Sequence, residues 1–95
     1  MAYTIITTTN ARRDTQQAID WENIRKPGLG EYFFNDLEAK LSELVITPAI
    51  GSIRYENVRI TFTKIFPYNI HYIIDDAKLH VIILRVLSQH KEPIN

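Results

Sequence analysis

The fold is decided by the stretch from Val58 to Leu87, VRITFTKIFPYNIHYIIDDAKLHVIILRVL. β-Branched and aromatic residues fill three runs within it, separated by the turns 64–67 and 75–78. In the first two runs the side chains alternate with a period of two, which is typical of strands covered on one face. The third run, 79–87, is apolar on both faces, as expected of a strand in the middle of a sheet. The stretch therefore predicts three consecutive strands joined by short turns.

The N-terminal half predicts one strand and two helices. Residues 3–8 are rich in β-branched and aromatic side chains and indicate the strand. Asn10 is the expected N-cap of a helix from 11 to 25, in which Trp21 is expected to anchor the helix to the sheet. Apolar residues at spacings of three and four predict the second helix, from 30 to 45.

These elements predict an α+β fold in the order β-α-α-β-β-β. Two N-terminal helices would pack on one face of a mainly antiparallel sheet, with the first strand beside the last. Residues 53–55 could add a short extended piece. The chain of 95 residues is expected to form one domain, 1–95, with a polar tail from 88 to 95.

Composition narrows the possible functions. The chain has no cysteine, which excludes disulfides and thiolate metal sites and fits a cytoplasmic location. We see neither a secretion signal in residues 1–4 nor an apolar run approaching the ~18 residues of a membrane span. Eleven basic and eleven acidic residues give a formal net charge of +0, which argues against broad binding to nucleic acid. Without a glycine-rich phosphate loop or a Cys/His cluster, the sequence implies no cofactor and no metal.

Three short segments carry a family resemblance: GLGEYF at 28–33, TPAIG at 47–51 and FPYNIHY at 66–72. In order and spacing they resemble the RelE/ParE superfamily of toxins, and the ParE-like branch (plasmid stabilisation proteins) in particular. The first is similar to the family's Gly-Leu-Gly-Glu-Arg-Phe opening of the second helix, the second to its Asn-Pro-x-Ile-Gly link and the third to its Phe-Pro-Tyr-Arg-Ile-x-Tyr strand. The chain departs from the family after the last strand, where Val-Leu-His-x-Arg-Arg-Asp-Pro is replaced by VLSQHKEP at 86–93.

The resemblance implies the toxin of a bacterial type II toxin–antitoxin system, neutralised by a cognate antitoxin. A ParE-like toxin would act by binding, with DNA gyrase as the expected target. The alternative is a RelE-like endonuclease that cleaves messenger RNA on the ribosome, which would make the chain an enzyme. The departures at Asn69, Ser88 and His90 motivate a third interpretation, a degenerate module that binds an antitoxin but is not toxic. An exposed apolar sheet edge could also cause self-association of the unpartnered chain.

Candidate site residues follow from the expected faces of the strands. If Val58, Ile60 and Phe62 face the helices, the side chain of Arg59 lies on the open face with Thr61 and Thr63. A nuclease of this fold needs cations on the scissile phosphate and a group that moves a proton. The candidates for these roles are Arg59 and Arg85 as phosphate holders and His71 or His90 as proton carrier.

Three further residues are candidates for contacts with the target or the antitoxin, namely Lys64, Tyr68 and Lys91. Each candidate also has a simpler explanation. Strand arginines are commonly solvated, the histidines could form cross-strand polar pairs, and Tyr68 alternates with Ile70 in a pattern that favours core packing.

Overall fold

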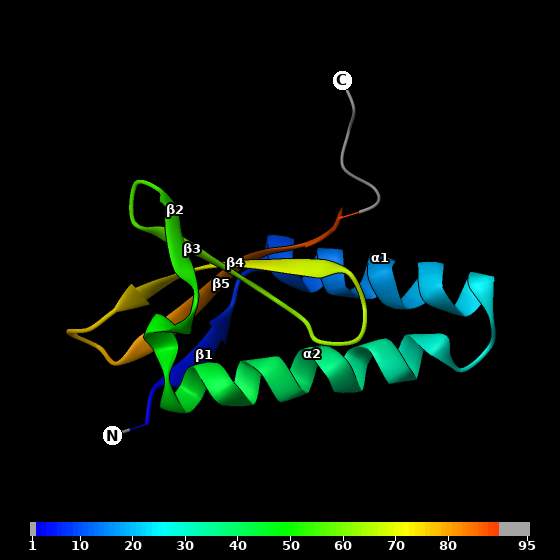
Figure 1. Cartoon of the computed structure of the whole chain (residues 1–95), viewed down its shortest axis with the longest axis horizontal. Helices are drawn as coiled ribbons and strands as arrows, with labels where there is room; N and C mark the ends of the chain where they lie inside the picture. The colour runs from blue at the N-terminus through cyan, green and yellow to red at the C-terminus, as the bar shows by residue number, and fades with distance from the viewer. Residues whose placement is uncertain (1, 90–95) are drawn as a thin grey trace.

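The computed structural model describes residues 2–89 and shows two helices packed on one face of a sheet (Figure 1). The elements are β1 (Thr4–Thr7), α1 (Thr9–Arg25), α2 (Leu29–Ile46), the short 3-10 helix η1 (Pro48–Ile50), β2 (Ser52–Tyr55), β3 (Val58–Phe62), β4 (Tyr68–Asp75) and β5 (His80–Ser88). The predicted α+β fold is confirmed. The piece that the sequence left open, at 53–55, is the strand β2, which forms a hairpin with β3.

The sheet has the strand order β1-β5-β4-β3-β2. β1 runs parallel to β5, and the other neighbouring strands are antiparallel. This confirms that the first strand lies beside the last and that the apolar run of β5 lies inside the sheet, between β1 and β4. The helical hairpin extends beyond the sheet, on the side opposite to the β4–β5 turn (Figure 1).

α1 begins earlier than predicted, and its N-cap is Thr8 rather than Asn10. The Thr8 hydroxyl accepts a hydrogen bond from the Ala11 amide at 3.2 Å and donates one to the Ile83 carbonyl at 2.8 Å. The same side chain therefore caps the helix and ties it to β5. Asn10 lies inside the first turn, because the chain turns into the helix as soon as β1 ends.

The two helices approach closely at their connecting turn, and two glycines allow it. Gly28 has φ 96°, a left-handed conformation that costs glycine little. At Gly30 a Cβ would lie 2.7 Å from the backbone carbonyl oxygen of Ile19 and 2.5 Å from the side-chain nitrogen Nδ2 of Asn23. The Asn23 side chain also accepts hydrogen bonds from both glycine amides, so the turn and the helix contact form one unit.

The core lies between the helices and the central strands. α2 contributes the buried side chains of Phe33, Leu37 and Leu44, and the strands contribute Tyr68, Ile70, Tyr72, Val81, Ile83 and Val86. The prediction for Trp21 is wrong, since this residue is 41% exposed. α1 turns a different stripe towards the sheet, formed by Ala11, Asp14, Ala18 and Glu22.

The predicted orientation of β3 is also wrong. Thr61 is buried and pairs with the core residue Ile70, whereas Phe62 is 41% exposed and pairs with Asn69. The buried hydroxyl of Thr63 donates to the Phe66 carbonyl and closes the loop that follows the strand. This bond fixes Thr63 and, two residues earlier, Thr61 on the side of the helices, so Phe62 faces outward.

Candidate functional site

Arg59 lies on the helix-side face of the sheet. Its cross-strand partner is the buried Tyr72, and its guanidinium donates to the carbonyl oxygens of Gly51 at 2.7 Å and Ala49 at 3.4 Å. The Tyr72 hydroxyl donates to the Pro48 carbonyl at 2.6 Å and accepts from the Gly51 amide at 2.9 Å. Both side chains therefore hold the segment around η1 against the sheet, and Arg59 is not on the open face.

Arg85 is bound to a carboxylate on α1. Its Nε and Nη2 donate to Asp14 Oδ2 at 2.7 Å and Oδ1 at 3.0 Å, and the Val86 amide donates to Asp14 Oδ2 at 3.0 Å. Hydrogen bonding to Asp14 raises the pKa of Arg85 above its ordinary value. Asp14 is buried, so the pair joins the first helix to an irregularity in the β4–β5 register opposite His71.

His71 lies on the open face of the sheet, in the middle of β4. Its cross-strand partners are Ile60 on β3 and Arg85 on β5. The hydroxyl of Tyr55 on β2 lies 3.3 Å from His71 Nδ1. The structure thus brings His71 near Tyr55, a residue that the sequence did not suggest, and separates it from Arg59.

Lys64 belongs to a charged cluster on α2 rather than to the sheet. Its ammonium group lies 3.2 Å from Glu43 Oε2, and Lys40 lies 3.1 Å from the other oxygen of the same carboxylate. Hydrogen bonds from Lys40 and then Lys64 lower the pKa of Glu43. The Lys64 side chain remains well exposed, so a contact with a partner stays a prediction that the geometry permits.

Tyr68 is part of the core. Its hydroxyl donates to the buried Glu22 carboxylate at 2.9 Å, and its ring centroid lies 4.5 Å from that of Phe33. Burial, followed by the hydrogen bond to Glu22, raises the pKa of Tyr68. The alternative of core packing is therefore the one that the geometry supports. His90 and Lys91, the remaining candidates, lie outside the described residues.

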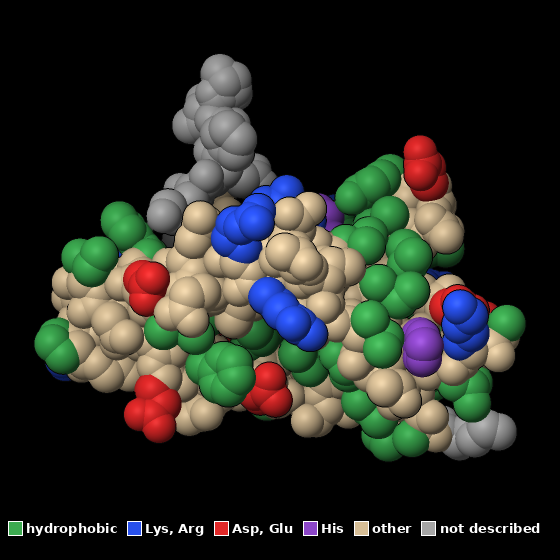
Figure 2. All heavy atoms as spheres, turned by 180° about the vertical axis from the view of Figure 1, so that it is seen from behind, with side chains coloured by type: hydrophobic (Ala, Val, Ile, Leu, Met, Phe, Trp, Pro, Cys, Tyr) green, Lys and Arg blue, Asp and Glu red, His purple; other side chains and the backbone are tan. Residues whose placement is uncertain are grey.

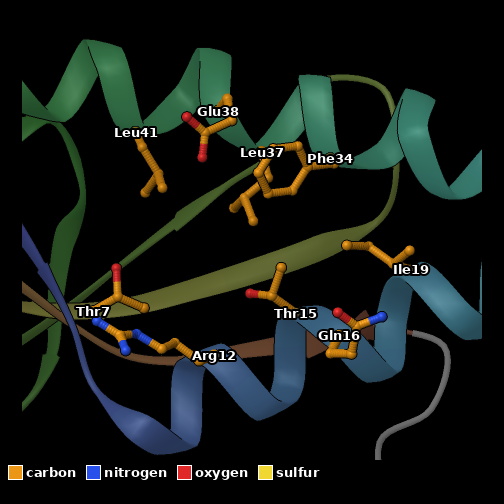
Figure 3. A pocket seen from close by; sticks show the side chains of 9 residues that line it. All are labelled: Thr7, Arg12, Thr15, Gln16, Ile19, Phe34, Leu37, Glu38 and Leu41. Atoms are coloured by element: carbon orange, nitrogen blue, oxygen red, sulfur yellow. The ribbon is translucent and has the colours of Figure 1, made fainter.

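A groove between the two helices was not predicted. It has a volume of about 250 Å³ and opens between α1 and α2 beside the end of β1 (Figure 3). Apolar side chains of Ile19, Phe34, Leu37 and Leu41 line it, with Arg12 and Glu38 among its polar residues. A second hollow of about 290 Å³ shares Thr7, Glu38 and Leu41 with it and continues along β1. The periodicity of the sequence could not reveal this groove, because the groove depends on the distance between the two packed helices.

The described residues 2–89 contain neither a cluster of metal ligands nor a membrane-spanning helix. No group of three or more histidine, aspartate or glutamate side chains in this range could hold a metal ion. Likewise, none of the helices described there is both long enough and apolar enough to cross a bilayer.

Solved structures with the same fold come from toxin–antitoxin systems. A chain of the chromosomal ParDE system from P. aeruginosa matches with a TM-score of 0.79 at 16% identity, covering 92% of this chain and 96% of that chain. A chain of the RelBE2 complex from Mycobacterium tuberculosis matches with a TM-score of 0.67 at 25% identity, covering 94% and 100%. A chain of the intact E. coli RelBE complex matches with a TM-score of 0.69 at 21% identity, covering 92% and 96%.

Sequence comparison supplies the family. No curated protein matches the sequence. A family model described as the ParE toxin of the type II toxin–antitoxin system parDE matches residues 5–93. Since this match spans nearly the whole chain, the protein belongs to the ParE toxin family of type II toxin–antitoxin systems.

Proposed function

We propose that this toxin acts by binding its target, DNA gyrase, rather than by cleaving RNA. The observation that carries the proposal is the bidentate pairing of Arg85 with the buried carboxylate of Asp14. A nuclease would need this cation to offset the charge that develops on the scissile phosphate. In this fold, however, the carboxylate of Asp14 already neutralises the positive charge of Arg85.

The second phosphate-holding candidate supports the same proposal. Arg59 donates to two backbone carbonyls around η1, on the opposite face of the sheet from His71. Asn69 stands where the family strand motif has an arginine, which removes another cation from β4. Arg85 lies opposite His71 in the strand register, but Arg59 lies on the other face of the sheet, so the two phosphate-holding candidates do not converge on one point, as chemistry at a single phosphate requires.

The partner proposed for neutralisation is a cognate antitoxin, because the ParDE and RelBE structures of the same fold are toxin–antitoxin systems. The groove between α1 and α2 suits an apolar peptide segment, since it offers an apolar lining with a cation and a carboxylate in its wall. Arg12 and Glu38 would select the orientation of the segment by charge.

The proposal is tested by two assays with the same purified chain. We expect it to inhibit supercoiling by gyrase and to leave ribosome-bound messenger RNA intact. Pulse labelling after induced expression should show DNA synthesis failing before protein synthesis. Messenger cleavage by the wild type that Arg85→Ala abolishes without loss of folding would overturn the proposal in favour of the RelE-like nuclease. If the folded chain arrests neither process, the degenerate antitoxin-binding module is the correct interpretation.

A further inference from the structure

The groove between α1 and α2 continues into the hollow beside β1, and the two spaces form one trough. They share Thr7, Glu38 and Leu41, so these three residues lie where the groove and the hollow meet. Apolar side chains line both ends, Ile19 and Phe34 in the groove and Ile5 and Val45 in the hollow. We call the combined space the interhelical trough.

Two charged side chains face the interhelical trough from opposite walls. Arg12 extends from α1 towards Thr7, and Glu38 extends from α2 towards the space between the helices (Figure 3). Within residues 2–89, neither side chain has a hydrogen-bond or ion-pair partner, since the ion pairs formed there involve other residues. The trough therefore holds two opposite charges apart, and both are open to a ligand.

Neither charge stabilises its own helix. Arg12 is the fourth residue of α1, near the positive end of the helix dipole, where a cation is unfavourable. Glu38 has no basic residue three or four positions away along α2, so it lacks the pairing that supports an exposed helix. Residues that break such local rules without a structural gain are typical of functional sites. Charge reversal at either position should leave the fold intact.

We propose that Arg12 and Glu38 are specificity-determining residues, which select the antitoxin that the interhelical trough accepts. The inference rests on the proposed partner, an antitoxin segment bound between the helices. Apolar side chains of that segment fill the two ends of the trough, an acidic side chain pairs with Arg12, and a basic side chain pairs with Glu38.

The charges supply a selectivity that apolar contact lacks. Hydrophobic side chains also gather over the sheet end of the molecule, so an apolar pattern alone does not distinguish the trough (Figure 2). A segment with its acidic and basic residues exchanged would place like charges together at both Arg12 and Glu38. Such repulsion rejects segments that match the trough only in their apolar residues.

The test is selection from a displayed library of short random peptides, with the wild type and the double variant Arg12→Glu/Glu38→Lys as baits. We expect the wild type to enrich apolar peptides that carry an acidic and a basic residue in one order. The double variant should enrich the opposite order. The matched control is Arg13→Glu/Glu31→Lys, which makes the same changes of charge at exposed positions of the same two helices, outside the trough. This control should select the same peptides as the wild type.

Calorimetric titration with a peptide selected by the wild type measures each charge separately. Arg12→Glu and Glu38→Lys should each weaken its binding by about 10-fold or more. High salt should reduce the preference for one charge order and leave the apolar part of the binding in place, because salt screens charges. Circular dichroism checks that each variant is folded.

Selection of the same charge order by the wild type and the double variant would overturn the proposal. So would peptides that still bind Phe34→Asp, a variant with a charge at one apolar end of the trough, or a folded wild type that enriches no peptide. An antitoxin that binds the wild type and both single variants equally would remove the role of the charges but not the antitoxin as partner. None of these results enters the gyrase assay, so failure of this inference is distinguishable from failure of the proposed mode of action.

Discussion

The carboxylate of Asp14 on α1 receives two hydrogen bonds from the Arg85 guanidinium and one from the Val86 amide. All three donors belong to β5, an interior strand that pairs with both β1 and β4. One buried acidic side chain thus holds the first helix at a fixed position on the sheet. The same contact uses the arginine that a nuclease would direct at its substrate.

Asp14→Asn should lower the free energy of unfolding by about 1–3 kcal/mol, since it removes the charge that Arg85 faces and can restore only part of the hydrogen bonding. Urea denaturation followed by circular dichroism measures this loss. Asp20→Asn is the control, because Asp20 lies on the same helix, is exposed, and accepts a hydrogen bond from the neighbouring Gln16. Equal midpoints for the wild type and Asp14→Asn would show that the pair does not stabilise the fold.

Asp36 has an equivalent role for the loop between β3 and β4. Its buried carboxylate accepts from the amides of Lys64 at 3.3 Å, Ile65 at 2.9 Å and Phe66 at 2.8 Å. Asp36→Ala should cost about 2–4 kcal/mol, because it leaves these partly buried amides without an acceptor. Hydrogen exchange should report faster exchange at residues 64–66, whereas Glu38→Ala, at an exposed site on the same helix, should leave this loop unchanged. Unaltered exchange in Asp36→Ala would contradict the assignment.

These buried acids explain which parts of the molecule the sequence could predict. The strands and helices follow from local periodicity, and the pairing of β1 with β5 follows from the apolar character of the central strand. Periodicity assigns charged residues to the solvent, so it could not place Asp14, Glu22 and Asp36 inside. Each of these carboxylates accepts a hydrogen bond from a residue that is distant in the sequence, with separations of 29, 46 and 71 positions. Only the packed fold brings such partners within reach.

The orientation of β3 was missed for a related reason. Val58, Ile60 and Phe62 form an apolar set, and an apolar set ordinarily faces the core. The open face of this sheet, opposite the helices, also carries apolar side chains, so the pattern could not distinguish the two sides. The hydrogen bond from Thr63 to Phe66 decided the orientation.

Tyr68 should make stability depend on alkaline pH. Its pKa is raised above the ordinary value of 10.0, mainly by burial and then by the hydrogen bond to Glu22. A group with a raised folded pKa stabilises the protein fully below its unfolded pKa, so this contribution should be lost as the pH rises beyond 10. Urea midpoints measured from neutral pH to strongly alkaline pH should fall for the wild type and fall less steeply for Tyr68→Phe.

The Tyr68→Phe variant should also be less stable at neutral pH by about 1–2 kcal/mol, because Glu22 loses a hydrogen-bond donor. Tyr32→Phe is the matched control, since Tyr32 is exposed and packs its ring, not its hydroxyl, against Phe66. If Tyr32→Phe and Tyr68→Phe change the alkaline fall to the same extent, burial of the Tyr68 hydroxyl is not its cause.

The helix turn allows a comparison of two glycines that are constrained in different ways. At Gly28 a Cβ meets no atom within 4 Å, so Gly28→Ala should cost only the left-handed backbone conformation, about 1 kcal/mol. At Gly30 a Cβ would lie 2.7 Å from the Ile19 backbone oxygen, which cannot yield unless the helices separate. Gly30→Ala should therefore cost about 2–3 kcal/mol, the range of overpacked cores.

Gly30→Ala should also widen the groove between α1 and α2 and weaken binding of an antitoxin peptide there, an effect that Gly28→Ala should not share. Calorimetric titration with such a peptide measures the difference, and equal affinity for both variants would show that the spacing of the helices does not control the groove.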